Sequence, residues 1–226
     1  MTYTRQSLRD LCRRRLGDLD VPYKWSDLQI NQWINDAIAD YSIHFPRRVE
    51  LKLDCTLDTH SYQLPADCHG LLSVEYPQGQ DPPEYLQPAD RFADGFYACD
   101  DLYDFLPSHD QDSPGKLWIS ANPTAAQDIK LVYLADHDYP DDDADEITVL
   151  ERHYELILLY VRWAAYQELA SSESSDPDPT SLALSTLELN AYRAQRLYLQ
   201  ALDKAERLES KTAVMPWVQD RWDRAY

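Results

Sequence analysis

The chain has 226 residues, of which 40 are acidic and 21 are basic, so its formal net charge at pH 7 is -19. This charge argues against tight binding to nucleic acid, which relies on clustered cationic side chains that neutralise phosphates. Hydrophobic residues make up 44% of the chain, which is enough to bury a core and excludes disorder driven by charge. Because the chain has neither a run of roughly 20 apolar residues nor the apolar start of a signal peptide, we expect no membrane span and synthesis in a cytoplasm.

The first predicted element is a helix over about residues 4–16. Its apolar residues recur on one side at helical spacing, and Gly17 follows as a helix-ending residue. The other side carries Arg5, Arg9 and Arg13 at four-residue steps. The pattern therefore predicts an amphipathic helix with a row of arginines.

A second helix is predicted to begin at a capping box. The hydroxyl of Ser26 can accept a hydrogen bond from the Gln29 N–H, while the Gln29 side chain reaches back to the backbone. Trp25, just before the cap, fits the hydrophobic staple of such a start. Apolar residues then recur at spacings of three and four until Phe45 and Pro46 end the helix.

The periodicity changes after the second helix from helical to alternating. Apolar and polar residues alternate from Val49 to Leu57, which predicts a strand with one wet face. The segment 84–110 is ambiguous, and its part 91–97 fits either a short helix or a loop. Turn residues separate the runs, which together predict a small antiparallel sheet or sandwich. Further short strands are predicted at 61–64, 71–76, 116–120 and 129–134.

Two more helices are predicted after the strands. Thr148 and Glu151 have the spacing of a second capping box, which would open a helix reaching about residue 169. The polar segment 171–179 contains two prolines and cannot continue that helix. A last helix over about 181–210 would be roughly 45 Å long, a length that is typical of a bundle.

Charge is concentrated in the middle of the sequence. Residues 53–150 contain 3 basic and 21 acidic side chains (-18), whereas the flanking parts carry +2 and -3. We therefore predict an α+β fold: a four-helix-type bundle with a long C-terminal helix, interrupted by a small antiparallel β-domain and followed by an extended tail. The predicted domains are the discontinuous bundle 1–48 with 146–212, the acidic β-insertion 49–145 and the tail 213–226.

Motifs of catalysis are missing from the sequence. The five glycines are too far apart for a phosphate-binding loop, the four cysteines form no C-x-x-C pair, and the six histidines and the serines fit no known catalytic spacing. We therefore expect no enzyme, no cofactor and free thiols in a reducing compartment. The acidic run 136–146 could attract a hard cation, but it lacks the spacing of a calcium loop, so a solvated loop is favoured and no metal site is predicted.

Two segments carry a resemblance to a known family. The first is Trp25-Ser26-Asp27-x-x-Ile30-x-x-Trp33-Ile34-Asn35-Asp36-Ala37, and the second is Leu64-Pro65-Ala66-Asp67. With the order of helices and strands, they resemble the head-to-tail adaptor (head-completion or connector) proteins of tailed bacteriophages. The resemblance implies a structural virion protein of the neck, assembled in the host cytoplasm.

The resemblance also implies the partners. The chain would form a homo-oligomeric ring, commonly of 12 copies, that joins the portal protein to the tail and extends the DNA channel. A downstream tail, nozzle or fibre protein would bind the β-insertion, and genomic DNA would pass without tight binding.

The tail is the candidate portal-binding segment, since the C-terminal segment of such adaptors often reaches the portal. It is rich in the residue types that dominate interfaces, on a terminus that would otherwise fray. Folding back onto its own bundle is the alternative. The candidate portal-binding residues are Met215, Pro216, Trp217, Val218, Arg221, Trp222, Arg224 and Tyr226.

The arginine row leaves three interpretations open. Arg5, Arg9 and Arg13 could form a solvated helix face, pair with acidic surface on a neighbouring subunit or the portal, or contact channel DNA. The acidity of the chain favours pairing between molecules over contact with DNA. These residues are therefore our candidates for inter-subunit or portal salt bridges.

Two other functions compete with the adaptor. An acidic DNA mimic or regulatory protein that blocks a basic surface would also use the -18 segment. An enzyme with an acidic cleft is the third possibility, although no motif names its reaction.

Overall fold

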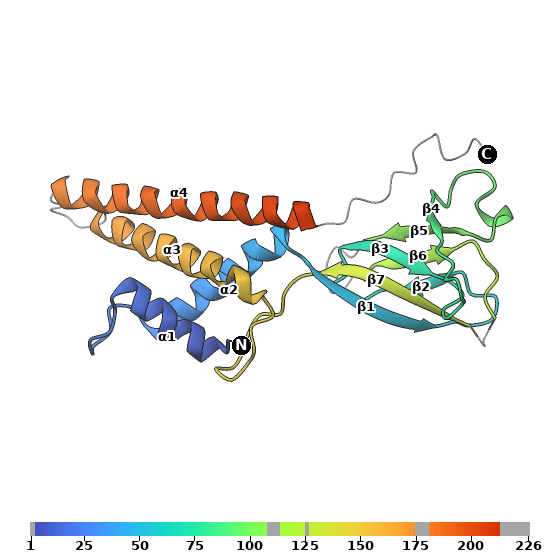
Figure 1. Cartoon of the computed structure of the whole chain (residues 1–226), viewed down its shortest axis with the longest axis horizontal. Helices are drawn as coiled ribbons and strands as arrows, with labels where there is room; N and C mark the ends of the chain where they lie inside the picture. The colour runs from blue at the N-terminus through green and yellow to red at the C-terminus, as the bar shows by residue number, and fades with distance from the viewer. Residues whose placement is uncertain (1–2, 108–113, 125–126, 175–180, 213–226) are drawn as a thin grey trace. The chain divides into compact units, whose positions relative to one another are not determined.

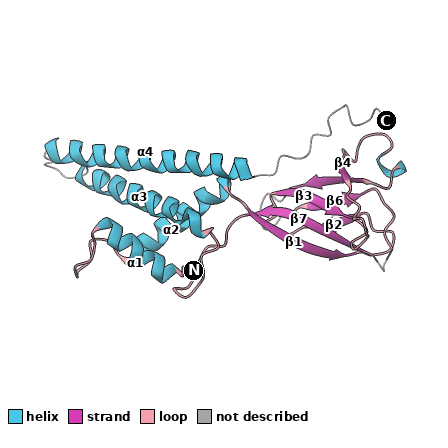
Figure 2. Cartoon of the chain, in the orientation of Figure 1, coloured by secondary structure: helices cyan, strands magenta, loops and turns pink. Residues whose placement is uncertain are grey.

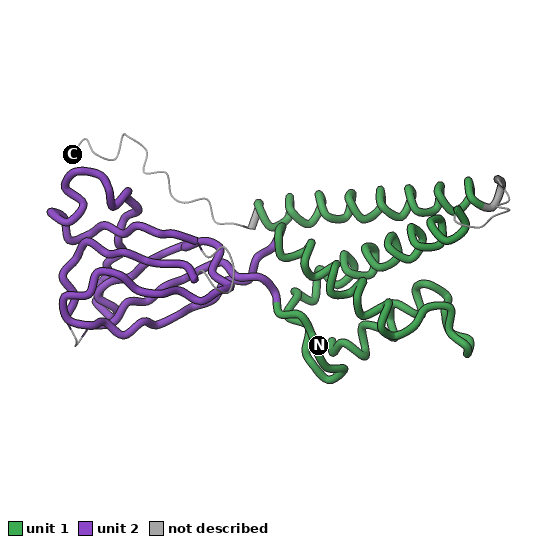
Figure 3. Tube along the Cα trace, turned by 180° about the vertical axis from the view of Figure 1, so that it is seen from behind, with its two compact units in different colours: residues 1–44, 138–226 green, residues 45–137 purple. Residues whose placement is uncertain are grey.

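The computed structural model describes residues 3–107, 114–124, 127–174 and 181–212. Over these residues the chain is a mixed α+β protein, which confirms the predicted class. The chain divides into two compact units (Figure 3). We call them the helical unit (Met1–His44 with Asp138–Tyr226) and the sheet unit (Phe45–His137).

The described part of the helical unit contains four α-helices (Figure 1). The third helix, α3, packs against each of the other three, and α1 also packs against α2. In Figures 1 and 3, α1 and α4 lie on opposite sides of α3. The core between the helices is apolar and includes Leu8, Ile34, Ile38, Ile157 and Val161. The helices are α1 (Arg5–Leu16), α2 (Asp27–His44), α3 (Tyr154–Ser174) and α4 (Ser181–Thr212).

Local capping fixes the ends of the first two helices. Thr4 and Ser7 form a capping box at the start of α1, and Gly17 ends the helix in the left-handed region with a φ of 72°. The predicted box before α2 is also present. The Gln29 N–H donates to Ser26 Oγ over 3.2 Å, and Gln29 Oε1 accepts from the Ser26 N–H over 2.9 Å.

The capping box predicted at Thr148 is wrong. The Thr148 hydroxyl oxygen instead accepts a hydrogen bond from the Asp138 N–H over 3.2 Å, and α3 is preceded by a 3-10 turn at Glu151–His153. Ile147 and Val149 are both buried, whereas the residues between and beside them are more exposed. This alternation is typical of extended chain, so burial of two apolar side chains prevails over the local cap signal.

The sheet unit contains two sheets over its described residues (Figure 2). One has the order β1-β7-β3 and is antiparallel, and the other has the order β2-β6-β5-β4, in which only the β4–β5 pair is parallel. The five predicted strands are present. The ambiguous segment 84–110 holds β4, β5 and a 3-10 turn at Phe96–Ala98. The strands are β1 (Arg47–Asp54), β2 (Ser61–Gln63), β3 (Gly70–Glu75), β4 (Gln87–Pro88), β5 (Leu102–Leu106), β6 (Lys116–Ile119) and β7 (Asp128–Ala135).

The central strand β7 carries the core of the sheet unit. Its odd-numbered residues, such as Ile129 and Leu131, are fully buried, while its even-numbered residues are partly exposed. Leu51 of β1 lies opposite Leu131, so the predicted alternation of β1 matches that of its neighbour. Apolar cross-strand pairs of this kind are the main stabilising contacts of a sheet.

Acidic residues are shared between the two units. The sheet unit has 16 acidic and 6 basic residues (-10), and the helical unit has 24 and 15 (-9). The difference from the -18 counted for residues 53–150 has two causes: the six acidic side chains of residues 138–146 are part of the helical unit, and residues 45–52, with a net charge of +2, are part of the sheet unit. The excess charge is therefore not a property of the sheet unit alone.

Candidate functional site

The arginine row of α1 is turned toward carboxylates of the same chain. Arg9 is only 7% exposed, and its Nη1 and Nη2 donate to the two carboxylate oxygens of Asp143, each over 2.8 Å. Arg5 Nε donates to Asp143 Oδ1 over 3.1 Å. The hydrogen bonds from Arg9, followed by those from Arg5, lower the pKa of Asp143 to about 2.

Arg13 is the most enclosed member of the row, at 5% exposure. Its Nη1 donates to Asp18 Oδ2 over 2.5 Å, and its Nη2 donates to Asp27 Oδ1 over 2.6 Å and to the Trp25 carbonyl over 3.0 Å. The guanidinium carbon also lies 3.9 Å from the centre of the Tyr23 ring. These contacts tie α1 to the loop that leads into α2.

The acidic segment 138–146 is held against the start of α1. The N–H groups of Arg5 and Gln6 donate to carbonyl oxygens of this segment over 3.0 and 3.1 Å, which satisfies amides that a helix start leaves unpaired. Asp145 Oδ2 accepts two backbone N–H groups of its own loop. Among the described residues, no group of three or more His, Cys, Asp or Glu side chains could hold a metal ion.

The structure thus places carboxylates of the same chain where the sequence prediction placed those of another molecule. Pairing of Arg5, Arg9 and Arg13 with a neighbouring subunit or the portal stays a prediction. Sequence reasoning missed Asp143 because it is one of several adjacent acidic residues and lies 134 positions from Arg9. No spacing rule connects such distant residues.

The candidate portal-binding residues Met215, Pro216, Trp217, Val218, Arg221, Trp222, Arg224 and Tyr226 lie outside the described residues. The last described element before them is α4, which ends at Thr212. Their role stays a prediction.

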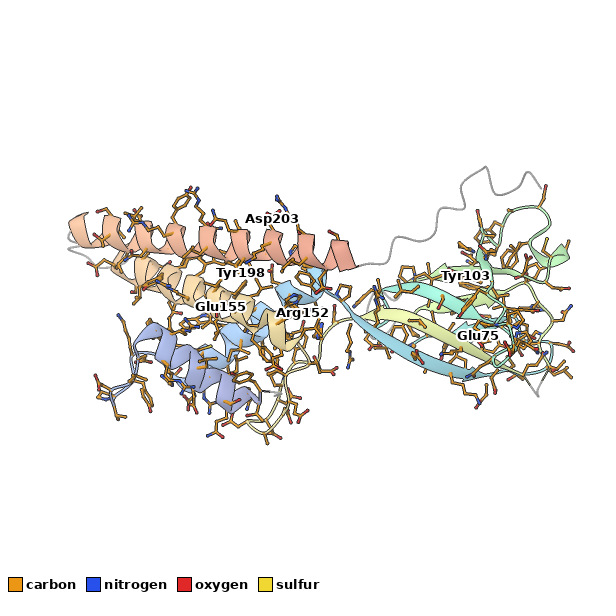
Figure 4. All side chains as sticks on the ribbon, in the orientation of Figure 1. Glu75, Tyr103, Arg152, Glu155, Tyr198 and Asp203 are labelled. Atoms are coloured by element: carbon orange, nitrogen blue, oxygen red, sulfur yellow. The ribbon has the colours of Figure 1, made fainter. Side chains whose placement is uncertain are left out.

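The inner side of α4 is fixed by polar and aromatic contacts. The Tyr198 hydroxyl donates to Asp40 Oδ2 of α2, and burial raises the pKa of Tyr198, which keeps that hydroxyl protonated. The Tyr198 ring stacks on Trp163 of α3 with centroids 6.2 Å apart. Farther along α4, Glu206 Oε1 lies 2.7 Å from His44 Nδ1. Figure 4 shows Tyr198 on the side of α4 that faces α3, and Asp203 on the opposite side.

A groove of about 350 Å³ lies where the start of α3 meets the last turns of α4. An ion pair between Arg152 and Glu209, with an N···O distance of 2.5 Å, lies at this groove, and Arg152 and Glu155 are marked there in Figure 4. The lining is Arg152, His153, Glu155, Leu156, Ala201, Lys204, Ala205, Leu208 and Glu209. This mixture of apolar and charged groups suits a peptide segment.

The sheet unit exposes aromatic side chains between β4 and β5. Phe92 is largely exposed, and the guanidinium carbon of Arg91 lies 4.5 Å from its ring centre and 3.6 Å from that of Trp118. Tyr97 is also exposed and meets His60 edge-on at 5.4 Å. Sequence analysis missed this surface, because it lies in the segment left ambiguous between helix and loop.

These features are typical of a protein that acts through contact surfaces, which are carried here by two compact units. A family model described as SU10 adaptor protein matches residues 1–223. The chain therefore belongs to this family of tailed-phage head-to-tail adaptors, which confirms the resemblance seen in the sequence. No curated protein matches the chain. None of the described helices has a stretch long and apolar enough to cross a membrane.

Proposed function

We propose that the chain is a structural, non-enzymatic adaptor that forms a ring, of 12 copies as in related adaptors, between the portal and the tail. The observation that carries this proposal is the family match over residues 1–223, which includes both units and most of the tail. Family membership also favours the adaptor over an acidic DNA mimic. In the virion the protein would occupy the neck, after assembly in the host cytoplasm.

The helices would form a four-helix-type bundle that makes the wall between neighbouring subunits. α3 supports this role because it contacts α1, α2 and α4 and thus holds the helical unit together. The outer sides of α1 and α4 remain available for neighbours. The ring would enclose a channel that continues the channel of the portal.

The charge of the two units suits a channel through which DNA slides. The helical unit carries -9 and the sheet unit -10, so either unit would present a net negative wall to the phosphates. A negative wall repels DNA and limits adhesion during packaging and ejection. The same charge explains how the protein can surround DNA without binding it tightly.

The two ends of the adaptor would bind different partners. Residues 215–226 would anchor the subunit to the portal through Trp217, Trp222 and their neighbours. The exposed aromatic surface around Phe92 would contribute to binding the downstream tail, nozzle or fibre protein. Exposed aromatic rings beside an arginine are typical of interface hot spots.

Electron microscopy of negatively stained samples tests the adaptor function. The purified chain should form rings alone or on purified portal particles. Unassembled monomers in both samples would overturn the proposal.

A second experiment tests the tail. Trp217→Ala with Trp222→Ala should abolish loading onto the portal, and Phe92→Ala with Tyr97→Ala in the sheet unit is the matched control that should load normally. If the tail instead folds back onto its own helices, for which the groove between α3 and α4 offers a place, both variants should load equally well.

A further inference from the structure

The outer face of α4 exposes large apolar side chains. Tyr192 is 61% exposed and Leu199 52%, and their spacing of seven residues places them on one side of the helix. Leu189, also exposed, continues this side by three residues. A shallow hollow of about 350 Å³ lies along it, lined by Tyr192, Gln195, Arg196, Leu199, Gln200 and Asp203.

The loop between α1 and α2 exposes a second apolar set. Val21 is 80% exposed and Leu19 60%, and Tyr23 beside them is half-exposed. Arg13 holds this loop in place through Asp18 and the Tyr23 ring. The loop therefore presents its two aliphatic side chains from a fixed backbone.

Charges at the two surfaces are complementary. The outer face of α4 carries Arg193 and Arg196, although the chain as a whole carries -19, and the carboxylate that lines its hollow, Asp203, is already paired with Arg207 over 3.0 Å. Neither arginine forms an ion pair within the described part of the chain, and the same holds for Asp20 between the two exposed aliphatic residues of the loop. The loop thus offers a carboxylate to a face that offers guanidinium groups.

The two surfaces lie on opposite sides of the helical unit. Figures 1 and 3 place α4 on one side of α3, and α1 with the loop that follows it on the other. One molecule cannot bring them together, but two copies arranged head to tail can. An interface between two different patches of the same chain repeats in each added copy and closes into a ring when the rotation allows it.

We propose that the outer face of α4 in one copy receives the α1–α2 loop of the next copy. Leu19 and Val21 would enter the hollow beside Tyr192 and Leu199, and Asp20 would face Arg196. This assignment rests on the proposed ring and names the surfaces that form its subunit contacts. It also explains why an acidic chain keeps one basic and apolar helix face exposed.

Cysteine cross-linking tests the assignment. The background is Cys99→Ser, which removes the exposed thiol. Val21→Cys and Leu199→Cys are made separately in this background. Each protein is treated with a short bis-maleimide, both in free solution and after loading onto portal particles. An equal mixture should give a covalent dimer that neither variant gives alone, and the double variant should give a ladder of oligomers. A double variant with Leu57→Cys and Phe92→Cys, both exposed in the sheet unit, is the control for chance collisions.

Association strength gives an independent measure. Tyr192→Ser with Leu199→Ser should weaken self-association by at least about tenfold, because apolar surface is lost from the contact. Leu19→Ser with Val21→Ser should do the same, and a mixture of the two double variants should stop at dimers. Circular dichroism should show unchanged folding, since all four side chains are exposed.

Three results would overturn the assignment. They are cross-linking of Leu199→Cys to itself as efficiently as in the mixture, cross-linking no stronger than in the control, and a cross-link that appears only after residues 213–226 are deleted. The last result would mean that the tail covers the outer face of α4 in the intact chain. Rings on the portal formed by the unmodified chain would meanwhile leave the adaptor function intact, so the two failures can be told apart.

Discussion

The helical unit and the sheet unit carry almost the same net charge but place it differently. In the helical unit, Arg13 and Asp18 form an ion pair whose side chains are only 6% and 4% exposed. In the sheet unit, ion pairs such as Lys52 with Asp128 lie at the surface of neighbouring strands. Charged side chains are therefore part of the interior of the helical unit, whereas they lie at the solvated surface of the sheet unit.

This difference follows from how each unit buries its core and holds its segments together. The sheet unit buries apolar residues of adjacent strands against one another, and its backbone groups are paired within the sheets. The helical unit must hold two segments without regular structure, the α1–α2 loop and residues 138–146, against α1. Arginines do this because one guanidinium group can bind several oxygen atoms at once.

The largest expected effect is on the buried ion pair of the helical unit. Arg13→Met leaves the Asp18 carboxylate enclosed without its cation, which should lower the free energy of unfolding by about 3–5 kcal/mol. Urea unfolding followed by the helical circular dichroism signal measures the loss. The sheet unit should unfold at an unchanged urea concentration.

A double variant separates the effect of the Arg13 charge from the effect of the packing of its side chain. With Asp18→Asn added to Arg13→Met, neither of the two positions carries a charge, while the amide oxygen can still accept the Lys24 N–H that Asp18 accepts over 2.7 Å. The double variant should therefore be more stable than the single one. Equal losses would mean that packing of the arginine, and not its charge, stabilises this unit.

The next effect concerns the apolar core of the sheet unit. Leu131→Ala removes a fully buried side chain from β7 and should cost about 2–5 kcal/mol. The loss should appear in the unfolding of the sheet unit and leave the helical signal in place. Leu57→Ala, at an exposed position, is the control, with a change within about 0.5 kcal/mol.

Sequence reasoning predicted the elements that local signals define. The box of Ser26 with Gln29, the stop at Gly17 and the alternation along β1 all act within a few residues, and all are present. The box at Thr148 failed for a physical reason, since Ile147 and Val149 are buried in an extended segment, whose Ile147 N–H donates to the distant Tyr3 carbonyl. Strand β5 was missed because Tyr103 is the only buried residue of its five, so the strand gives no clear alternation.

The candidate site was harder to predict than the fold. Helical spacing correctly placed Arg5, Arg9 and Arg13 on one side of α1, but spacing says nothing about which carboxylates lie opposite. Asp143 differs from its acidic neighbours only through its position in the folded chain. The exposed face of α4 was also missed, because the sequence predicts a long helix over about 181–210 but does not show which sides of it the other helices cover.

A smaller effect is expected from the carboxylate that joins Arg5 and Arg9. Its folded pKa of about 2 lies below the ordinary 3.8, so ionised Asp143 stabilises the fold at pH values above 3.8, and this contribution is lost as the pH falls through about 2. Asp143→Asn should therefore lower the urea midpoint of the helical unit at neutral pH. The gap to the unmodified chain should shrink between these two pH values.

The neighbouring residue provides the control for this pH dependence. Asp142→Asn changes the loop charge equally, but no ion pair joins Asp142 to an arginine in the part of the chain that the structure describes. Its urea midpoint should follow that of the unmodified chain at each pH. A constant gap for Asp143→Asn down to pH 2 would show that its effect is not that of the charge.

The smallest effect is expected at the surface of the sheet unit. Lys52 is exposed, and its Nζ lies 2.7 Å from Asp128 Oδ2, so water and salt screen the pair. Lys52→Ala should leave the urea midpoint of the sheet unit almost unchanged, and high salt should remove any residual difference. Lys130→Ala, which breaks the similar pair with Glu50, should behave in the same way. A loss as large as that of Asp143→Asn would mean that surface ion pairs stabilise the sheet unit as much as the arginine row stabilises the helices, and the contrast between the two units would then lie in geometry alone.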